Sequence, residues 1–172
     1  MEKSPLRMIA AVGLVAGSVL GLVGSFVPTD SMRGLAWGLD GTFLVVAVAA
    51  LTVLALRAGE DLSACGFLVF TVGQGLVLAS VPMSLADGSA LMVTGAVLWA
   101  GGLAIVSLGR GMPMFVRATG LIACAMFLVF AVQGLTGSQV DALSKPLPFF
   151  AYPFLALTLF GWAWRTLKLA QN

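Results

Sequence analysis

The sequence has few charged residues, no histidine and only two cysteines. Charged residues make up 9% of the chain, whereas soluble domains carry about 25%. Without histidine, the chain lacks the commonest general base and the commonest zinc ligand. Two cysteines are too few for a disulfide framework, and a net charge of +2 is too small for a nucleic-acid partner. The composition therefore argues against a soluble enzyme and a nucleic-acid-binding protein, and it predicts no cofactor and no metal site.

Apolar residues fill the chain instead: 60% of the residues are hydrophobic and the mean hydropathy is +1.07. A soluble fold could not hide this much apolar surface from water, so we expect the surrounding solvent to be lipid. Runs of roughly 20 apolar residues suit membrane-crossing helices, and none alternates as a barrel strand would. We predict an all-α membrane helix bundle, a single integral-membrane domain over residues 1–172 with six transmembrane helices in three helix pairs. The predicted spans are residues 8–27, 35–56, 64–82, 89–108, 118–137 and 149–168.

The basic residues predict an orientation. If the N-terminus is cytoplasmic, the cytoplasmic segments hold most of the lysines and arginines, as the positive-inside rule requires. Both termini are then cytoplasmic, and we expect a multi-pass protein of the bacterial cytoplasmic (inner) membrane. The inner set is Lys3, Arg7, Arg57, Arg110, Arg117, Arg165 and Lys168, and the outer set is Arg33 and Lys145.

One stretch of sequence occurs twice. Residues 64–76 read ACGFLVFTVGQGL, and residues 123–135 read ACAMFLVFAVQGL. A weaker echo places Trp37 and Trp99 at similar positions in the spans that precede these two copies. A repeat of this size is a supersecondary unit, which here predicts parallel helix pairs with a period of about 60 residues. The alternative is chance similarity, because membrane sequences use few residue types.

Asp40 is the one ionisable residue well inside a predicted span. An acid at the centre of a membrane helix costs about 2.5–3.5 kcal/mol to insert, so such a residue usually marks a functional site. Gln74 and Gln133 hold equivalent positions in the repeat, and with Asp40 they form a candidate intramembrane polar site. Arg33 and Lys145 are candidate ion-pair partners of Asp40. The alternative is an acid satisfied at the interface and two glutamines that bond separately between helices.

Small and aromatic residues predict packing and anchoring. Glycine recurs every four residues at Gly13, Gly17 and Gly21, which predicts a glycine zipper, a helix-packing face that another backbone approaches closely. Gly34 and Gly38 are expected to extend this face into the second span. Residues expected to anchor the helices at the membrane interfaces are Trp37, Tyr152, Trp162, Trp164, Arg165 and Lys168.

The first predicted helix pair also carries a resemblance in architecture. Its glycine-spaced segment 13–21, followed by Pro28 and a returning glycine-rich helix, resembles the small six-helix acid-resistance membrane proteins of bacteria. The resemblance spans most of the chain but contains no diagnostic motif, so it transfers no site residue. It implies a small inner-membrane protein with a role in stress.

Two functions are compatible with the sequence. The first is a non-enzymatic accessory, stress-related or helix-interaction component, whose partners are the lipid bilayer and either further copies of itself or a larger membrane complex. The alternative is a small transporter or channel with its polar site around Asp40, Gln74 and Gln133. We expect no enzyme, because the chain has no histidine and no paired buried carboxylates for general acid–base catalysis.

Overall fold

The computed structural model describes residues 5–109 and 111–168, which form six α-helices and no β-strand. The all-α prediction is therefore confirmed. The connections between helices are short except the one between α5 and α6, which ends in one π-helical turn, η1 (Leu147–Ala151). The helices are α1 (Pro5–Gly24), α2 (Asp30–Arg57), α3 (Asp61–Ser80), α4 (Leu85–Leu108), α5 (Met114–Leu135) and α6 (Tyr152–Lys168).

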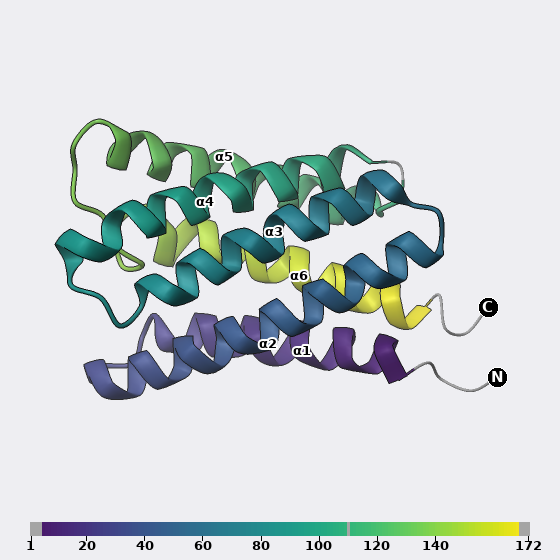
Figure 1. Ribbon diagram of the computed structural model, residues 1–172, viewed down its shortest axis with the longest axis horizontal. Coiled ribbons are helices and arrows are strands. Elements are labelled where there is room, and N and C mark those ends of the chain that lie inside the picture. Colours follow the sequence, from purple (N-terminus) through teal and green to yellow (C-terminus); the bar gives the residue numbers. More distant parts are fainter. Residues whose placement is uncertain (1–4, 110, 169–172) are drawn as a thin grey trace.

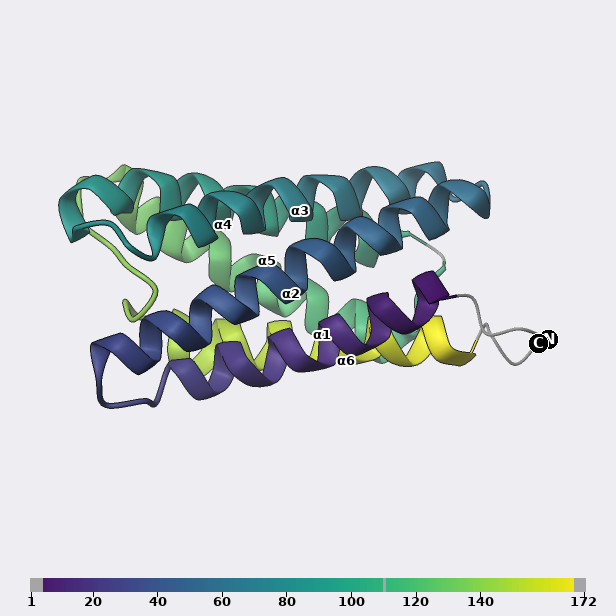
Figure 2. The same cartoon turned by 60° about the horizontal axis from the view of Figure 1, so that its bottom comes forward.

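The helices lie side by side in sequence order and close into a ring. Each helix packs against the helices before and after it in the chain, and α1 packs against α6 (Figures 1 and 2). Helix α1 begins and α6 ends at the same end of the bundle, which we call the terminal end (right in Figure 1). The α1–α2, α3–α4 and α5–α6 connections lie at the other end, which we call the far end. Because every helix in the ring has two neighbours, the three helix pairs stay a prediction.

Five helices, α1 to α5, are long and apolar enough to cross a membrane. The outer face of α1 shows what surrounds them: Val12, Val15, Val19 and Val23 are exposed at helical spacing, while the inner face buries mainly small residues. Such a row of branched apolar side chains is unfavourable in water and suits hydrocarbon. The bundle therefore has the outward-facing surface of an integral membrane protein.

Helix α6 is the shortest of the six, with 17 residues. At 1.5 Å per residue it is roughly 26 Å long, slightly less than the bilayer core of about 30 Å. The π-helical turn η1 precedes it directly, so the helical segment starts near Phe149, where the predicted sixth span begins. That α6 crosses the membrane stays a prediction.

Glycine allows α1 and α2 to pack closely. A Cβ atom at Gly13 would lie 2.8 Å from Ala47 Cβ and 3.0 Å from the Phe43 carbonyl oxygen. A Cβ atom at Gly17 would lie 2.7 Å from the Leu44 side chain. Larger residues at these two positions would push the helices apart.

Gly34 and Gly38 do not continue this packing face inside the chain. A Cβ atom at either position meets no described atom within 4 Å. The reason is their position around α2: the helix contacts α1 through Trp37 and Leu44, and Gly38 lies about 100° further round than Trp37. Within this chain the close packing predicted for Gly34 and Gly38 is therefore absent.

An aromatic cluster fills the ring interior from its middle toward the terminal end. Phe67 and Phe70 of α3 meet Trp162 of α6 edge-on, with ring centroids 4.9 and 5.7 Å apart. Trp99 of α4 stacks on Phe70 at 5.8 Å and meets Phe127 of α5 at 5.0 Å. Such pairs contribute about 0.5–1.5 kcal/mol each beyond the burial of their area. Trp162, expected at a membrane interface, is 1% exposed and belongs to this core.

Candidate functional site

Asp40 lies deep in α2, because the helix begins earlier than the sequence predicts. The chain enters α2 at Asp30, whose carboxylate favours a helix N-terminus and pairs with Arg33 one turn later at 2.6 Å. Asp40 is therefore roughly 15 Å along the helix from its first residue, about half the depth of a bilayer core. The predicted start at residue 35 placed it closer to the surface.

The two predicted ion-pair partners of Asp40 lie elsewhere. Arg33 donates to Asp30 and, at 2.8 Å, to the Val27 carbonyl oxygen, so it braces the α1–α2 connection. Lys145 is exposed in the α5–α6 connection. Neither described ion pair includes Asp40, and its Oδ1 atom is buried without a hydrogen-bond partner among the described residues. The prediction of Arg33 as a partner failed because a nearer acid, Asp30, takes its guanidinium.

Gly21 makes room for the Asp40 carboxyl group. A Cβ atom on Gly21 would lie 3.0 Å from Asp40 Oδ2, so only glycine leaves this space open on α1. The nearby hydroxyl of Ser18 donates to the Leu14 carbonyl oxygen at 2.7 Å, and it is therefore not a donor to Asp40. In α1, Gly13 and Gly17 thus allow close packing against α2, and Gly21 leaves space for the Asp40 carboxyl group.

Gln74 joins Asp40, and Gln133 does not. Gln74 is 1% exposed and lines the same cavity as Asp40, whereas Gln133 is half-buried and does not line it. Gln74 follows Phe70 by four positions, but Gln133 follows Phe130 by three. Both phenylalanines face the interior, so at about 100° per residue the two amides point in directions about 100° apart. The predicted trio is therefore a pair, Asp40 and Gln74.

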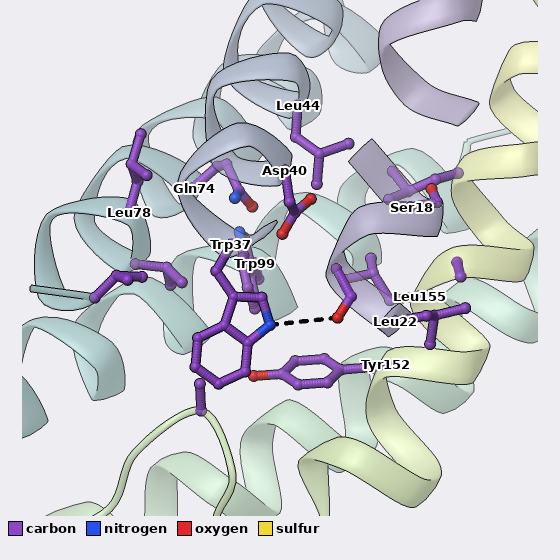
Figure 3. Close-up of a pocket in the computed structure, with 16 residues that line it drawn as sticks. Ser18, Leu22, Trp37, Asp40, Leu44, Gln74, Leu78, Trp99, Tyr152 and Leu155 are labelled. Carbon is purple, nitrogen blue, oxygen red and sulfur yellow. Dashed lines mark hydrogen bonds between the residues drawn. The ribbon is translucent and has the colours of Figure 1, made fainter. Parts of the chain in front are cut away.

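Asp40 and Gln74 line a cavity of about 50 Å³ inside the ring, which we call the Asp40 cavity (Figure 3). Trp99 also lines it. Asp40 Oδ1, Gln74 Oε1 and Trp99 Nε1 are all buried without a hydrogen-bond partner among the described residues. An unpaired buried polar atom costs about 1–3 kcal/mol, and one water needs about 10–15 Å³. The cavity therefore has room, two acceptors and one donor for a few waters or one small polar ligand.

Aromatic rings form much of the remaining wall. Trp37 Nε1 donates to the Gly21 carbonyl oxygen at 3.3 Å, which fixes the indole across α1 and α2. Tyr152 of α6 directs its hydroxyl toward Trp37 (Figure 3). With Trp99, whose ring also packs against Phe70 and Phe127, these residues give the Asp40 cavity an aromatic lining. Sequence reasoning assigned Trp37 and Tyr152 to interfaces and missed Trp99, although the echo between Trp37 and Trp99 was a signal for both indoles.

The Asp40 cavity adjoins a second cavity on the side of the far end of the ring. A larger cavity there, of about 180 Å³, includes Arg33 and Asp141 in its lining. Toward the terminal end, the aromatic cluster of Phe67, Phe70 and Trp162 fills the interior. The polar site thus has a second cavity on one side and an aromatic cluster on the other. The two cavities share Trp37, Val77, Val81 and Ala142.

The remaining predicted anchors lie at the terminal end. Trp164 is exposed, and Lys168 Nζ lies 4.9 Å from the centre of its ring. Arg165 pairs with Glu60 at 2.7 Å. Lys3 and Arg110, which the orientation argument also used, lie outside the described residues.

No cluster of three histidine, cysteine, aspartate or glutamate residues in the described ranges is arranged to hold a metal ion. The chain matches no protein-family model, no curated protein and no solved structure. The resemblance to acid-resistance proteins therefore stays an expectation, and the function is argued from the site itself.

Proposed function

We propose that the protein is a small membrane transporter that admits a small ammonium-type cation to the Asp40 cavity. One observation carries the proposal: Asp40 Oδ1 and Gln74 Oε1, two buried acceptors without a partner among the described residues, belong to side chains that line a single cavity. A carboxylate and an amide oxygen suit a ligand that donates hydrogen bonds and carries positive charge, and the aromatic wall suits the same ligand. A space that holds only a few waters favours a small ligand such as methylammonium over a bulky one.

The shape of the interior favours a transporter over a channel. A channel needs a continuous path, whereas the aromatic cluster closes the interior between the Asp40 cavity and the terminal end. A central site open to one side at a time is the arrangement that alternating access requires. With both termini in the cytoplasm of a bacterium, as the basic residues predict, the open side would be the outer one.

The accessory or stress-related function predicted from the sequence is the competing proposal. An accessory protein acts through its outer helix faces and has no need of a ligand at Asp40. The two proposals therefore predict opposite results in a binding measurement.

Replacing Asp40 tests the proposal. In the purified protein in neutral detergent, we expect methylammonium chloride to raise the melting temperature and the bulkier tetraethylammonium chloride at equal concentration to have no effect. Asp40→Asn should weaken the apparent affinity for methylammonium at least tenfold, because a hydrogen bond to a charged group is worth about 1.5–3 kcal/mol and 1.4 kcal/mol is a factor of ten.

Asp30→Asn is the matched control. It removes one negative charge from the same helix, but its side chain is 96% exposed and lies outside the cavity. It should keep the affinity of the wild type. An equal response of all three proteins to methylammonium, or no response of the wild type, would contradict the transporter proposal and favour the accessory one.

A further inference from the structure

A separate cavity of about 80 Å³ lies at the terminal end of the ring. It shares no lining residue with the Asp40 cavity. Apolar side chains of α2 and α3 form part of its wall, and the polar lining comes from three other places: the start of α1, the residue before α3, and the end of α6. These polar residues are Arg7, Glu60, Trp162, Arg165 and Thr166, and we call the space the Arg7 cavity.

The Arg7 cavity has more hydrogen-bond donors than acceptors. Glu60 Oε1 accepts from Arg165 at 2.7 Å, and Thr166 Oγ1 donates to the Trp162 carbonyl oxygen at 2.8 Å. The indole Nε1 of Trp162 is a donor only; it is buried and has no partner among the described residues. Arg7 takes part in none of the ion pairs or side-chain hydrogen bonds of residues 5–109 and 111–168. The unused donors are thus the Arg7 guanidinium and the Trp162 indole N–H, and the unused acceptor is Glu60 Oε2.

Charge in the Arg7 cavity is also unbalanced. Two guanidinium groups face one carboxylate, which leaves one positive charge in a partly buried space. Arginine forms strong hydrogen bonds with phosphate oxygens, and basic pockets between membrane helices on the cytoplasmic side bind lipid head groups. On α1, the neighbours of Arg7 are exposed and apolar: Met8 and Ile9 offer a surface along which an acyl chain would lie.

We propose that the Arg7 cavity binds a phosphate group, carried either by an anionic phospholipid or by free phosphate. The phosphate oxygens accept hydrogen bonds from Arg7 and from Trp162 Nε1, while the Glu60–Arg165 pair holds the second guanidinium in place. The cavity volume of about 80 Å³ is several times the roughly 10–15 Å³ that one water needs, so the space is larger than a single-water site. This site is independent of the transporter proposal.

Arg7→Gln and Arg57→Gln form the test. Both variants remove one positive charge from the terminal end, but Arg57 is exposed and does not line the cavity. The melting temperature of each purified protein is followed during titration with phosphatidylglycerol and, separately, with phosphatidylcholine. Phosphatidylglycerol should stabilise the wild type and Arg57→Gln at similar concentrations, and Arg7→Gln should need at least tenfold more. Phosphatidylcholine should stabilise none of them to the same extent.

Two further arms distinguish the sources of phosphate and the role of the indole. Inorganic phosphate, compared with chloride at equal ionic strength, identifies free phosphate as a ligand if its effect also depends on Arg7; an effect of phosphatidylglycerol alone identifies the lipid. Trp162→Phe keeps an aromatic ring in the core but removes the N–H, and it should weaken phosphate binding several-fold. Equal responses of Arg7→Gln and Arg57→Gln to phosphatidylglycerol and to phosphate would overturn the proposal.

Discussion

The burial of Gln74 suits it to bind a ligand in the Asp40 cavity but lowers the stability of the folded protein. Its Oε1 has no partner among the described residues and lines the Asp40 cavity, so the amide is desolvated without compensation. Gln74→Leu should therefore raise the free energy of unfolding in detergent by about 1 kcal/mol. The same change should weaken methylammonium binding at least tenfold, because it removes one of the two acceptors. Thermal unfolding with and without methylammonium measures both effects.

Gln133→Leu is the control for Gln74→Leu. It makes the same substitution at the equivalent position of the second sequence copy, but Gln133 does not line the cavity. We expect it to leave methylammonium binding unchanged. The account fails at this point if Gln133→Leu weakens binding as much as Gln74→Leu does.

The sequence predicts that a buried polar site exists better than it predicts which residues form it. Asp40 and Gln74 were recognisable because a polar side chain in an apolar span is costly and needs a reason. Gln133 holds the equivalent place in the repeat, but it follows the preceding phenylalanine by one residue fewer than Gln74 does, which turns its amide away. Trp99 and Tyr152 were missed as site residues because an aromatic residue in a membrane helix has several uses, and only the ring of helices decides which one applies.

At the scale of single helices, Gly13 of α1 lies in a tight helix contact, whereas Gly38 of α2 faces open space. Gly13→Ala should lower the free energy of unfolding by about 1–3 kcal/mol, because the new Cβ meets Ala47 Cβ at 2.8 Å and the Phe43 carbonyl oxygen at 3.0 Å. Gly38→Ala should raise it by about 0.5–1 kcal/mol, because the site is open and alanine favours the helix. Chemical unfolding in detergent compares the two. A larger loss of stability for Gly38→Ala than for Gly13→Ala would contradict this packing of α1 on α2.

Helix positions are more accessible to prediction than helix ends. Long apolar runs locate the helices because hydrocarbon tolerates little else. The predicted second span starts at residue 35, whereas α2 starts at Asp30. Charged residues make residues 30–34 look like a loop, but Asp30 and Arg33 form an ion pair in the first turn of the helix. The π-helical turn η1 that precedes α6 is not predicted either, because nothing local in the sequence distinguishes it from ordinary helix.

At the scale of the whole molecule, the number of crossings fixes where the termini lie. If α6 crosses the bilayer with α1 to α5, both termini are on the same side, which the basic residues predict to be the cytoplasmic one; five crossings would place them on opposite sides. We expect a C-terminal tag to react with a membrane-impermeant reagent only after cell lysis. In a variant without native cysteines, Ser138→Cys at the far end should be labelled on intact cells, and Ala58→Cys at the terminal end should not. Labelling of both the C-terminal tag and Ser138→Cys on intact cells would show that α6 does not cross.

The closure of the ring by contact between α1 and α6 cannot be predicted from the sequence of any single helix. Hydropathy gives each helix a place in the membrane, but the order of neighbours depends on side-chain packing around a shared interior. That interior is the basis of the functional proposal, since it holds two cavities with polar lining toward the far end and an aromatic cluster toward the terminal end.

The central claim, that a small cation crosses the membrane by way of Asp40, is tested most directly in proteoliposomes. Uptake of radiolabelled methylammonium is followed near pH 6, where an alkylamine, with a pKa like that of lysine at about 10.4, is almost wholly cationic. We expect saturable uptake by the wild type and by Asp30→Asn at similar rates, and uptake at least tenfold slower by Asp40→Asn. Equal rates for Asp40→Asn and the wild type, or wild-type rates no faster than those of protein-free liposomes, would contradict the claim.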